Sequence, residues 1–388
     1  MNRYDALVIG TGGVGSAALY HLARRGARVA GIDRFAPGHD RGSSHGQSRL
    51  IRQAYYEHPD YVPLVLRAYQ LWSQLEQTTG RRLLHPIGLL QVGPAEGAVL
   101  AGVEASARAH QIGIERLTAD EIVRRWPGFR IPAAWSGLYE PQAGYLEVEA
   151  AVRAHAEQAV RSGAELHLGC AALGWQHAGD DLVVRTEAGS FVCDRLIVTA
   201  GAWAAGLLAD LAITLEVRRK PLFWFAGGDA YRAADAYRAG DGCPAFLFET
   251  TRGLFYGVPT IDRRGVKLAE HTGGQVVNDP LAVDRRLDPQ DERRVAAFAA
   301  EHLPALAGPA TEHSVCLYTM SPDEHFVVDR HPREPRVVFA AGLSGHGFKF
   351  APVLGEALAD LALDGRTALP IGFLSADRPG LRAGAVAQ

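Results

Sequence analysis

The sequence predicts an α/β protein with two domains, one containing a parallel sheet and the other a mainly antiparallel sheet. Three observations lead to this prediction. The chain has 388 residues, which is too long for one ordinary core. Apolar strands followed by glycine-rich turns occur near both ends of the chain and in its middle. Between them lie strand-like runs joined by turns, which are typical of an antiparallel sheet.

The first strand–glycine unit begins with the short apolar run Ala6 to Ile9, as expected for a strand that is covered on both faces. Gly10, Gly12 and Gly15 then supply the pattern G-x-G-x-x-G. The first glycine permits a tight turn, the second lets the backbone approach a pyrophosphate, and the third lets a helix pack against the strand. An amphipathic helix follows and ends at Gly26.

The strand after this helix, "ARVAGID", ends at Asp33. A carboxylate there is placed to accept both hydroxyls of an adenosine ribose, and it disfavours a 2′-phosphate. Strand, glycine turn, helix, second strand and terminal acid in this order predict a Rossmann-like, dinucleotide-binding unit. They do not separate FAD from NAD, so an NAD-dependent dehydrogenase is one alternative at this point.

Two later segments repeat the strand–glycine pattern. "RLIVTAGAWA" begins at Arg195, and "RVVFAAGLSGHGFKFAPVLGEALADLAL" lies near the C-terminus. The nucleotide domain is therefore built from discontinuous pieces, which we assign to residues 1–80, 141–215 and 325–388. The strand-like runs "PIGLLQVG", "KPLFWFAG" and "AFLFETTRGLFYGVP" assign the substrate domain to 81–140 and 216–324.

The composition argues against several classes of partner. A formal net charge of −3 gives no long-range attraction to nucleic acid or to an anionic membrane. No apolar run approaches the ~20 residues needed to span a bilayer, and the strand at Ala6 leaves no room for a signal peptide. The four cysteines show no C-x-x-C spacing, so we expect neither a disulfide scaffold nor a metal site. Few cysteines also suit a cytoplasmic location.

Six segments, taken in order, resemble a known family. They are the N-terminal fingerprint ending at Asp33, "SSHGQSRLIRQAY", "GLFYGVP", "GVKLAEHT", "CLYTMSPDEHFVVDRHP" and "GLSGHGFKF". Almost from end to end, the chain resembles the flavin-dependent amine oxidases of the monomeric sarcosine oxidase and N-methyltryptophan oxidase family. The resemblance implies a monomer whose dinucleotide is FAD, attached through a thioether from Cys316 to the flavin 8α-methyl group.

An arginine pair in the second of these segments suggests an anion site. Arg49 and Arg52 are three residues apart, so on a helical turn they would share a face. The resemblance implies that Arg52 binds the substrate carboxylate, to which a guanidinium offers a bidentate fork, while Arg49 lies over the flavin. It places the second carboxylate-binding residue, which also contacts the cofactor, at Lys349.

The glycine turn before Lys349 suggests a further contact with the cofactor. The amides of Gly345, His346 and Gly347, at the start of a helix, would face the flavin pyrimidine edge and stabilise the negative charge of reduced flavin. In the loop before the arginine pair, the resemblance implies that the flavin contacts are Ser44 and His45.

The strand "GVKLAEHT" supplies two candidate catalytic residues. Alternation along a strand places Lys267 and His271 on the same side. The resemblance implies that Lys267 is the oxygen-activating residue near flavin N5 and that His271 lies beside the substrate amine. It implies that two aromatic residues shape the pocket, namely Tyr256 and Tyr318.

The activity that the resemblance implies is an oxidase. A secondary amino acid such as sarcosine would react with O2 and water to give a primary amino acid, formaldehyde and H2O2. Gln47 and Ser48 depart from the commonest family pair, Asp-Thr, so a bulkier N-methyl amino acid, a cyclic imino acid or another amine stays open. The other alternative is a non-oxidase FAD dehydrogenase or a subunit of a larger complex, against which Cys316 and Lys267 argue.

Overall fold

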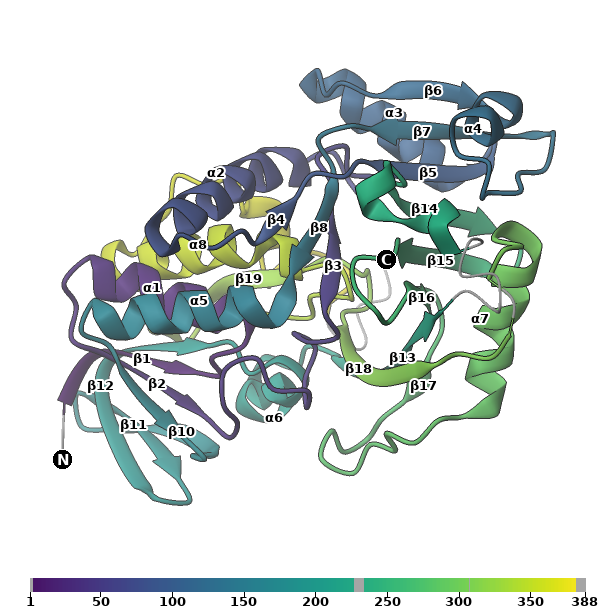
Figure 1. Ribbon diagram of the computed structural model, residues 1–388. Coiled ribbons are helices and arrows are strands. Elements are labelled where there is room, and N and C mark those ends of the chain that lie inside the picture. The colour runs from purple at the N-terminus through teal and green to yellow at the C-terminus, as the bar shows by residue number, and fades with distance from the viewer. Residues whose placement is uncertain (1–2, 227–233, 307, 382–388) are drawn as a thin grey trace.

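The computed structural model describes residues 3–226, 234–306 and 308–381, and in these ranges the chain forms two large sheets and one small sheet (Figure 1). Helices pack against both large sheets. The α-helices in these ranges are α1 (Gly13–Arg24), α2 (Tyr61–Thr79), α3 (Ala98–His110), α4 (Ala119–Arg125), α5 (Val148–Arg161), α6 (Ala204–Leu207), α7 (Pro289–His302) and α8 (Ala351–Asp364). None of them is both long and apolar enough to cross a membrane.

The first large sheet is built from three separated parts of the chain. Its strands are β1 (Arg3–Ile9), β2 (Val29–Asp33), β9 (Glu165–Leu168), β10 (Ala172–Ala178), β11 (Asp181–Thr186), β12 (Gly189–Val198), β19 (Val327–His331) and β20 (Glu334–Ala341). Strands β9, β2, β1, β12 and β20 lie side by side in this order and run parallel. Strands β10, β11 and β19 add antiparallel pairs at the margins. The predicted parallel, Rossmann-like core is confirmed.

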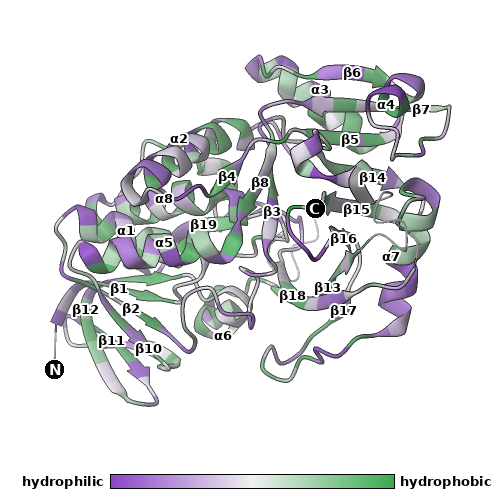
Figure 2. Cartoon of the chain, viewed as in Figure 1, coloured by the Kyte–Doolittle hydropathy of each residue, from purple (hydrophilic) through white to green (hydrophobic). Residues whose placement is uncertain are grey.

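Both faces of this sheet are buried, as the apolar run after the N-terminus predicts. Along β1, Ala6 and Val8 pack in the cluster formed with helices α1, α2, α5 and α8, which stack together on one side in Figure 1. Leu7 and Ile9 point to the opposite face, into a cluster with residues of β11 and β12. In Figure 2 these strands carry hydrophobic colours, whereas α1 and α5 alternate between hydrophobic and hydrophilic turns. Strand β1 is buried on both faces and α5 on one face, whereas α1 is buried along nearly its whole length and is exposed only at its C-terminal end.

The second large sheet is mainly antiparallel, as predicted. Its strands are β5 (Leu89–Pro94), β6 (Glu115–Thr118), β7 (Trp135–Glu140), β13 (Glu216–Phe225), β14 (Ala245–Thr250), β15 (Gly253–Val258), β16 (Val266–Glu270), β17 (Gln275–Val276) and β18 (Glu312–Met320). Strands β5 and β14 form a parallel pair, and the remaining pairs in this sheet are antiparallel.

The two faces of the second sheet pack against different parts of the protein. On one face, Phe223 and Phe248 pack with Phe298 of α7 in an aromatic core. On the other face, Tyr256 and Cys316 pack with residues of α3. The small sheet, formed by β3 (Ser48–Ile51), β4 (Leu84–His85) and β8 (Gly144–Glu147), lies between the large ones in Figure 1. The strands of the two large sheets fall within the segments assigned above to the two domains, whereas β4, from the segment 81–140, pairs with β8 of the nucleotide-domain segment 141–215. The boundaries themselves stay a prediction.

Candidate functional site

A cavity of about 340 Å³ lies at the carboxyl ends of β1 and β2, where Rossmann-like sheets hold their ligands. Its wall includes Asp33 on the first sheet, Arg49 of β3 and Tyr318 of β18, so it extends from the first sheet to the second. The predicted cofactor contacts that line it are Gly10, Gly12, Asp33, Ser44, Gly345 and Gly347.

The three glycines of the first turn differ in what their missing side chains would meet. A Cβ on Gly10 would lie 2.6 Å from the carbonyl oxygen of Thr199, and one on Gly15 would lie 1.8 Å from the carbonyl oxygen of Gly10. The packing of the protein itself therefore demands these two glycines. A Cβ on Gly12 would meet Ser44 Oγ only at 3.8 Å, at the cavity wall. The missing side chain of Gly12 thus leaves space in the cavity for the pyrophosphate of a dinucleotide.

Asp33 is fixed at the cavity wall by backbone donors. Its Oδ2 accepts a hydrogen bond from the amide of Thr11 at 2.7 Å, and its Oδ1 accepts one from the amide of Phe35 at 2.9 Å. The hydroxyl of Thr11 also donates to Oδ2, at 3.2 Å, so the remaining lone pair is on Oδ1, which can still accept a hydrogen bond from a ribose hydroxyl. The turn, the terminal acid and the long cavity together fit a dinucleotide.

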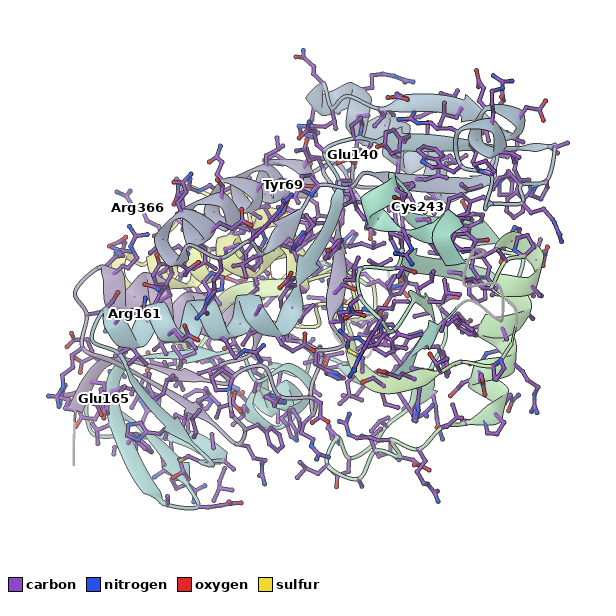
Figure 3. The ribbon with its side chains drawn as sticks, viewed as in Figure 1. Tyr69, Glu140, Arg161, Glu165, Cys243 and Arg366 are labelled. Atoms are coloured by element: carbon purple, nitrogen blue, oxygen red, sulfur yellow. The ribbon has the colours of Figure 1, made fainter. Side chains whose placement is uncertain are left out.

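Cys316 is buried beside a guanidinium. Arg49 Nη2 donates a hydrogen bond to its Sγ at 2.9 Å. Burial would raise the pKa of this thiol, but the charges of Arg49 and His45 outweigh burial and lower the pKa to about 6. Cys243, labelled in Figure 3, has no such neighbour, and burial raises its pKa to about 12. The neighbouring charges therefore favour the thiolate of Cys316, and a thiolate is the nucleophilic form of cysteine.

Lys267 lies in the same cluster, on the face of β16 that alternation predicted. Its Nζ donates to the carbonyl oxygens of Gly46 at 2.7 Å and Ser48 at 2.6 Å, and it lies 3.3 Å from Ser48 Oγ. Burial, together with the charge of Arg49, lowers its pKa well below the usual value. Nearby, the buried Nε2 of His45 meets no hydrogen-bond partner within the described ranges. Three basic side chains thus surround Cys316.

A second, smaller cavity of about 40 Å³ adjoins the first. The two cavities share the walls Arg49, Tyr318, Gly345 and Phe348. The small cavity is also lined by the remaining predicted pocket residues, namely Arg52, Tyr256, His271 and Lys349. The structure therefore brings the predicted substrate contacts together next to the predicted dinucleotide contacts.

His271, one of the two histidines that line the small cavity, is held in a setting that favours its neutral form. His271 Nδ1 lies 3.2 Å from the hydroxyl of Tyr318, within hydrogen-bonding distance. Burial, and then the charge of Lys220, lowers its pKa to about 3. An uncharged imidazole can accept a hydrogen bond from one side and donate one to the other.

The expected helical turn at the arginine pair is wrong. Arg49 lies in strand β3, where it is paired with Leu146 of β8, and Arg52 follows the end of that strand. The two side chains diverge: Arg49 reaches Cys316, whereas Arg52 reaches Glu57. Both still line the small cavity.

Glu57 is a site residue that sequence reasoning missed. Arg52 Nη2 donates to both of its carboxylate oxygens at 2.6 Å, and the pair is almost fully buried. Burial would raise the pKa of Glu57, but Arg52, His346 and Lys349 lower it to about 2, so the carboxylate is charged. In "QAYYEHPDY" an acid between a tyrosine and a histidine reads as a surface residue. The feature of the sequence that could have indicated its role is its position, five residues after the arginine with which it forms an ion pair.

Lys349, which also lines the small cavity, is held by two hydrogen bonds. Its Nζ donates to the carbonyl oxygen of His346 at 2.7 Å and to the Tyr55 hydroxyl at 3.2 Å. Burial, and then the charge of Arg52, lowers its pKa well below the usual value.

Glu140, labelled in Figure 3, fixes the segment that follows Arg52 by accepting hydrogen bonds from the amides of Gln53 and Ala54.

One of the three amides predicted to face the flavin is already used. The amide of His346 donates to the carbonyl oxygen of Leu343 at 3.1 Å, so this part of the prediction is wrong. The imidazole of His346 contacts the Tyr55 hydroxyl at 2.6 Å and the carbonyl oxygen of Glu324 at 3.0 Å. Gly345 and Gly347 line the large cavity and stay candidates.

Comparison with known proteins agrees with this arrangement. The sequence profile of the family described as FAD dependent oxidoreductase matches residues 5–361. Monomeric sarcosine oxidase of Streptomyces avermitilis is 41% identical over 97% of both chains. N-methyl-L-tryptophan oxidase of Yersinia pestis is 37% identical over 97% of this chain and 99% of its own.

The solved structure of NikD, an amino acid oxidase essential for nikkomycin biosynthesis, covers 97% of this chain and 98% of its own, with a TM-score of 0.83 at 25% identity. These findings confirm the resemblance and identify the dinucleotide as FAD. The chain belongs to the FAD-dependent oxidoreductase family, in the group of the monomeric sarcosine oxidases and the N-methyl-L-tryptophan oxidases.

Proposed function

We propose that this protein is an oxidase of secondary amino acids with a small N-alkyl group, such as sarcosine, and that O2 is the electron acceptor. The observation that carries the proposal is the shared wall between the two cavities, because a ligand in the small cavity then adjoins the FAD cavity. The names of the relatives support the substrate class. FAD, when bound, supplies the two-electron chemistry that removes hydride from the carbon next to nitrogen and returns the electrons to O2.

The charges in the small cavity suit a single carboxylate. Its arginine and lysine side chains are Arg49, Arg52 and Lys349. Arg49 is paired with the sulfur of Cys316 and Arg52 with the carboxylate of Glu57, which leaves Lys349 to be balanced. A bound substrate carboxylate would balance Lys349 and would favour its charged form. A buried charge that gains a partner in this way is stabilised, and one that loses its partner is costly.

Uncharged groups in the wall of the small cavity suit the amine. The neutral imidazole of His271 and the hydroxyl of Tyr318 are hydrogen-bonding groups that carry no positive charge to repel it. Only an unprotonated secondary amine can lose hydride, so activity is expected to rise with pH through the pKa of the bound amine. Tyr256 of β15 also lines the small cavity.

The size of the cavity favours a small side chain. A volume of about 40 Å³ admits only a few water-sized groups, since one probe sphere takes about 10–15 Å³. Leu50, Leu247 and Phe348 form the apolar part of its wall. The indole of N-methyltryptophan would require these side chains to move. Sarcosine, N-methylalanine or a small cyclic imino acid would require less movement.

Three finer features belong to the same proposal. FAD is held covalently by a thioether to the sulfur of Cys316, and Lys267, in its ammonium form, promotes the reaction with O2. Two buried carbonyl oxygens and a hydroxyl oxygen around its Nζ match the three donors of an ammonium group. The protein acts as a monomer, as the name of its sarcosine-oxidising relatives suggests.

The proposal is tested by an H2O2-coupled screen of the purified holoenzyme. The panel contains sarcosine, N-methylalanine, N-methyltryptophan, proline and pipecolate, with dimethylamine as the control that lacks a carboxylate. We expect the highest kcat/KM for sarcosine or N-methylalanine. A preference for proline or pipecolate would reassign the substrate to cyclic imino acids, and equal turnover of dimethylamine would contradict a role for Arg52 and Lys349.

A further inference from the structure

A second buried lysine holds the chain segment that carries His271. Lys220 lies in the middle of β13 with 2% of its surface exposed. Its Nζ donates to three successive carbonyl oxygens, those of His271 at 3.0 Å, Thr272 at 2.7 Å and Gly273 at 3.2 Å. The three donors of one ammonium group therefore hold a whole turn of backbone.

The turn is fitted closely around this lysine. Gly274 has a φ of +108°, and a Cβ there would lie 2.9 Å from Lys220 Cδ and 2.8 Å from the carbonyl oxygen of Arg219. The chain therefore passes so near the aliphatic stem of Lys220 that only glycine fits. The start of the turn is fixed independently, because the amide of His271 donates to the carbonyl oxygen of Leu254 at 2.7 Å.

The same ammonium group also contacts the partner of His271. Lys220 Nζ lies 5.2 Å from the centroid of the Tyr318 ring, within the range of a cation–π contact. The Tyr318 hydroxyl lies 3.2 Å from His271 Nδ1. One side chain thus touches the backbone of the first residue and the ring of the second, and both of these residues line the small cavity.

The ammonium group of Lys220 is unexpected at a buried position. Within the described ranges, no carboxylate forms an ion pair with Lys220. On the same face of β13, Leu222 and Trp224 are buried and apolar, and Arg218 on the other side is a like charge that pairs with Glu216. A buried ammonium group without a carboxylate partner is costly, and a hydrophobic residue of similar size would pack without that cost.

We propose that Lys220 is a positioning residue for the amine end of the substrate pocket, where its ammonium group fixes the 271–273 turn and so presents His271 to Tyr318 and to the substrate. The inference rests on the proposed function of this pocket as an amine-oxidising site. Lys220 does not line the small cavity, so it acts through His271 and Tyr318.

The electrostatics of Lys220 give the proposal a pH signature. Burial lowers the pKa of Lys220 to about 8, with Glu270 of β16 and Asp291 of α7 acting upward and Arg218 and Arg294 acting downward. Below about pH 8 the group is an ammonium with three donors for three carbonyl oxygens. Above that pH it loses the charge and one donor, so the turn is held less firmly.

The test compares the holoenzymes of K220M and K220R with wild type. Arg218→Met is the matched control, because it removes a neighbouring charge from the same strand but leaves the three carbonyl contacts intact. At neutral pH we expect K220M to lose about 10-fold or more in kcat/KM for sarcosine, the scale of a slightly misplaced pocket group. The dissociation constant of propionate, a carboxylate without an amine, is measured from the flavin absorbance and should change less than about two-fold.

The pH profile provides the second readout. Arginine stays charged at all accessible pH values. The ratio of K220R to wild-type kcat/KM, in which the ionisation of the substrate cancels, should therefore rise above about pH 8. A flat ratio, unchanged sarcosine turnover in K220M, or equal weakening of propionate would each overturn the proposal. If K220M fails to fold, the K220R profile decides alone.

A measurement without turnover separates this inference from the proposed function. In NMR spectra of histidine-labelled protein, with H271N to assign the signal, the pKa of His271 should rise in K220M above the value of about 3 set partly by Lys220. An unchanged His271 titration would overturn the inference. If sarcosine and the other amines are not oxidised but the titration shifts, the proposed function fails while the link from Lys220 to His271 stands.

Discussion

At the scale of single residues, the site depends on charges that are buried close to one another. Arg49 lowers the pKa of Cys316, Arg52 lowers that of Glu57, and Lys220 lowers that of His271. For Cys316 and Glu57 the basic group outweighs the effect of burial, whereas for His271 it adds to the effect of burial. The thiolate, the carboxylate and the neutral imidazole that result are the forms that the proposed chemistry needs.

The first residue-scale prediction concerns Cys316. Flavin should remain with the denatured wild-type chain as fluorescence on a gel, and C316S should lose it. Because the thiolate is the reactive form, attachment of FAD to the apoprotein should slow as the pH falls below about 6. Release of all flavin from wild type by acid precipitation would show that the bond does not exist. C243S, which removes an equally buried thiol, is the control.

The second prediction concerns the carboxylate end of the pocket. Lys349→Ala or Arg52→Ala should weaken the binding of carboxylate ligands by about 2–5 kcal/mol, the scale for one lost partner of a buried charge pair. Lys349→Ala is the cleaner variant, since Arg52→Ala also leaves Glu57 without its ion pair. Glu57→Gln should act in the opposite direction and tighten propionate, because it removes a competing carboxylate. Titration of flavin absorbance gives these affinities, and equal loss for amines without a carboxylate would refute this assignment.

The third prediction concerns Lys267. Lys267→Met removes the charge and keeps the length of the side chain, so FAD should stay attached and sarcosine should still reduce the enzyme anaerobically. Reoxidation by O2 should slow by about 10²-fold, the scale for loss of one aimed electrostatic group. Stopped-flow mixing of the reduced variant with oxygenated buffer measures the rate. A wild-type rate would remove Lys267 from the reaction with O2.

At the scale of elements, the sequence predicts correctly those segments whose structure depends on residues within the same stretch of chain. The apolar run before Gly10 and the helix and strand up to Asp33 appear as β1, α1 and β2 because their periodicity and glycines act within one stretch of chain. The turn at Arg49 was mistaken for helix because its partner strand, β8, lies about a hundred residues away. A short polar segment takes the structure that such a distant partner imposes.

The element-scale prediction contrasts two glycines of the first turn. Gly15→Ala places a Cβ 1.8 Å from the carbonyl oxygen of Gly10, so the turn must distort and the apoprotein should unfold at a lower temperature. Gly12→Ala meets the protein only at 3.8 Å, so the apoprotein should keep its stability but incorporate less FAD. Thermal unfolding of both apoproteins and their flavin content after reconstitution test this. Equal destabilisation by the two variants would contradict the assigned roles.

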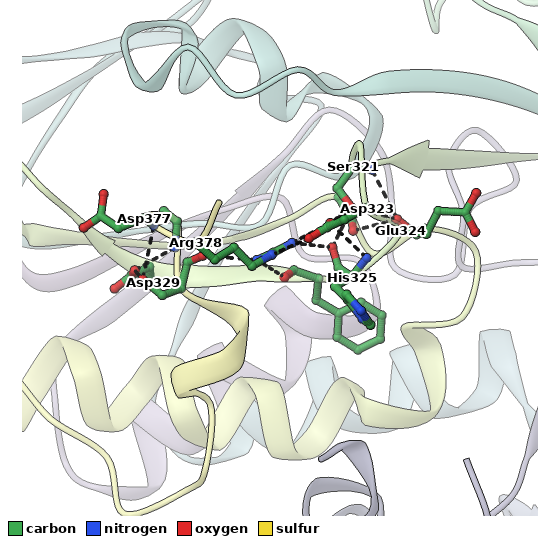
Figure 4. Close-up of polar contacts among 12 residues, drawn as sticks. Ser321, Asp323, Glu324, His325, Asp329, Asp377 and Arg378 are labelled. Carbon is green, nitrogen blue, oxygen red and sulfur yellow. Dashed lines mark hydrogen bonds and ion pairs between the residues drawn. The ribbon is translucent and has the colours of Figure 1, made fainter. Parts of the chain in front are cut away.

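At the scale of the whole molecule, the small cavity draws on distant parts of the chain. Arg52, His271, Tyr318 and Lys349 come from four stretches. The loop before β19 is fixed from the C-terminal segment, where Arg378 donates to both carboxylate oxygens of Asp323 (Figure 4). Ser321 of this loop donates its amide to Ser344 Oγ, next to the predicted flavin turn. The sequence could name most of these residues by resemblance, but the pairing of Glu57 with Arg52 needed the assembled fold.

The central claim is that this site passes electrons from a secondary amino acid to O2. The direct measurement is the stoichiometry of the reaction with sarcosine, followed by an oxygen electrode together with assays for formaldehyde and H2O2. The account predicts that one O2 is consumed for each formaldehyde and each H2O2 formed. Formaldehyde that appears only with an added dye acceptor, while O2 stays untouched, would contradict it and make the protein a dehydrogenase.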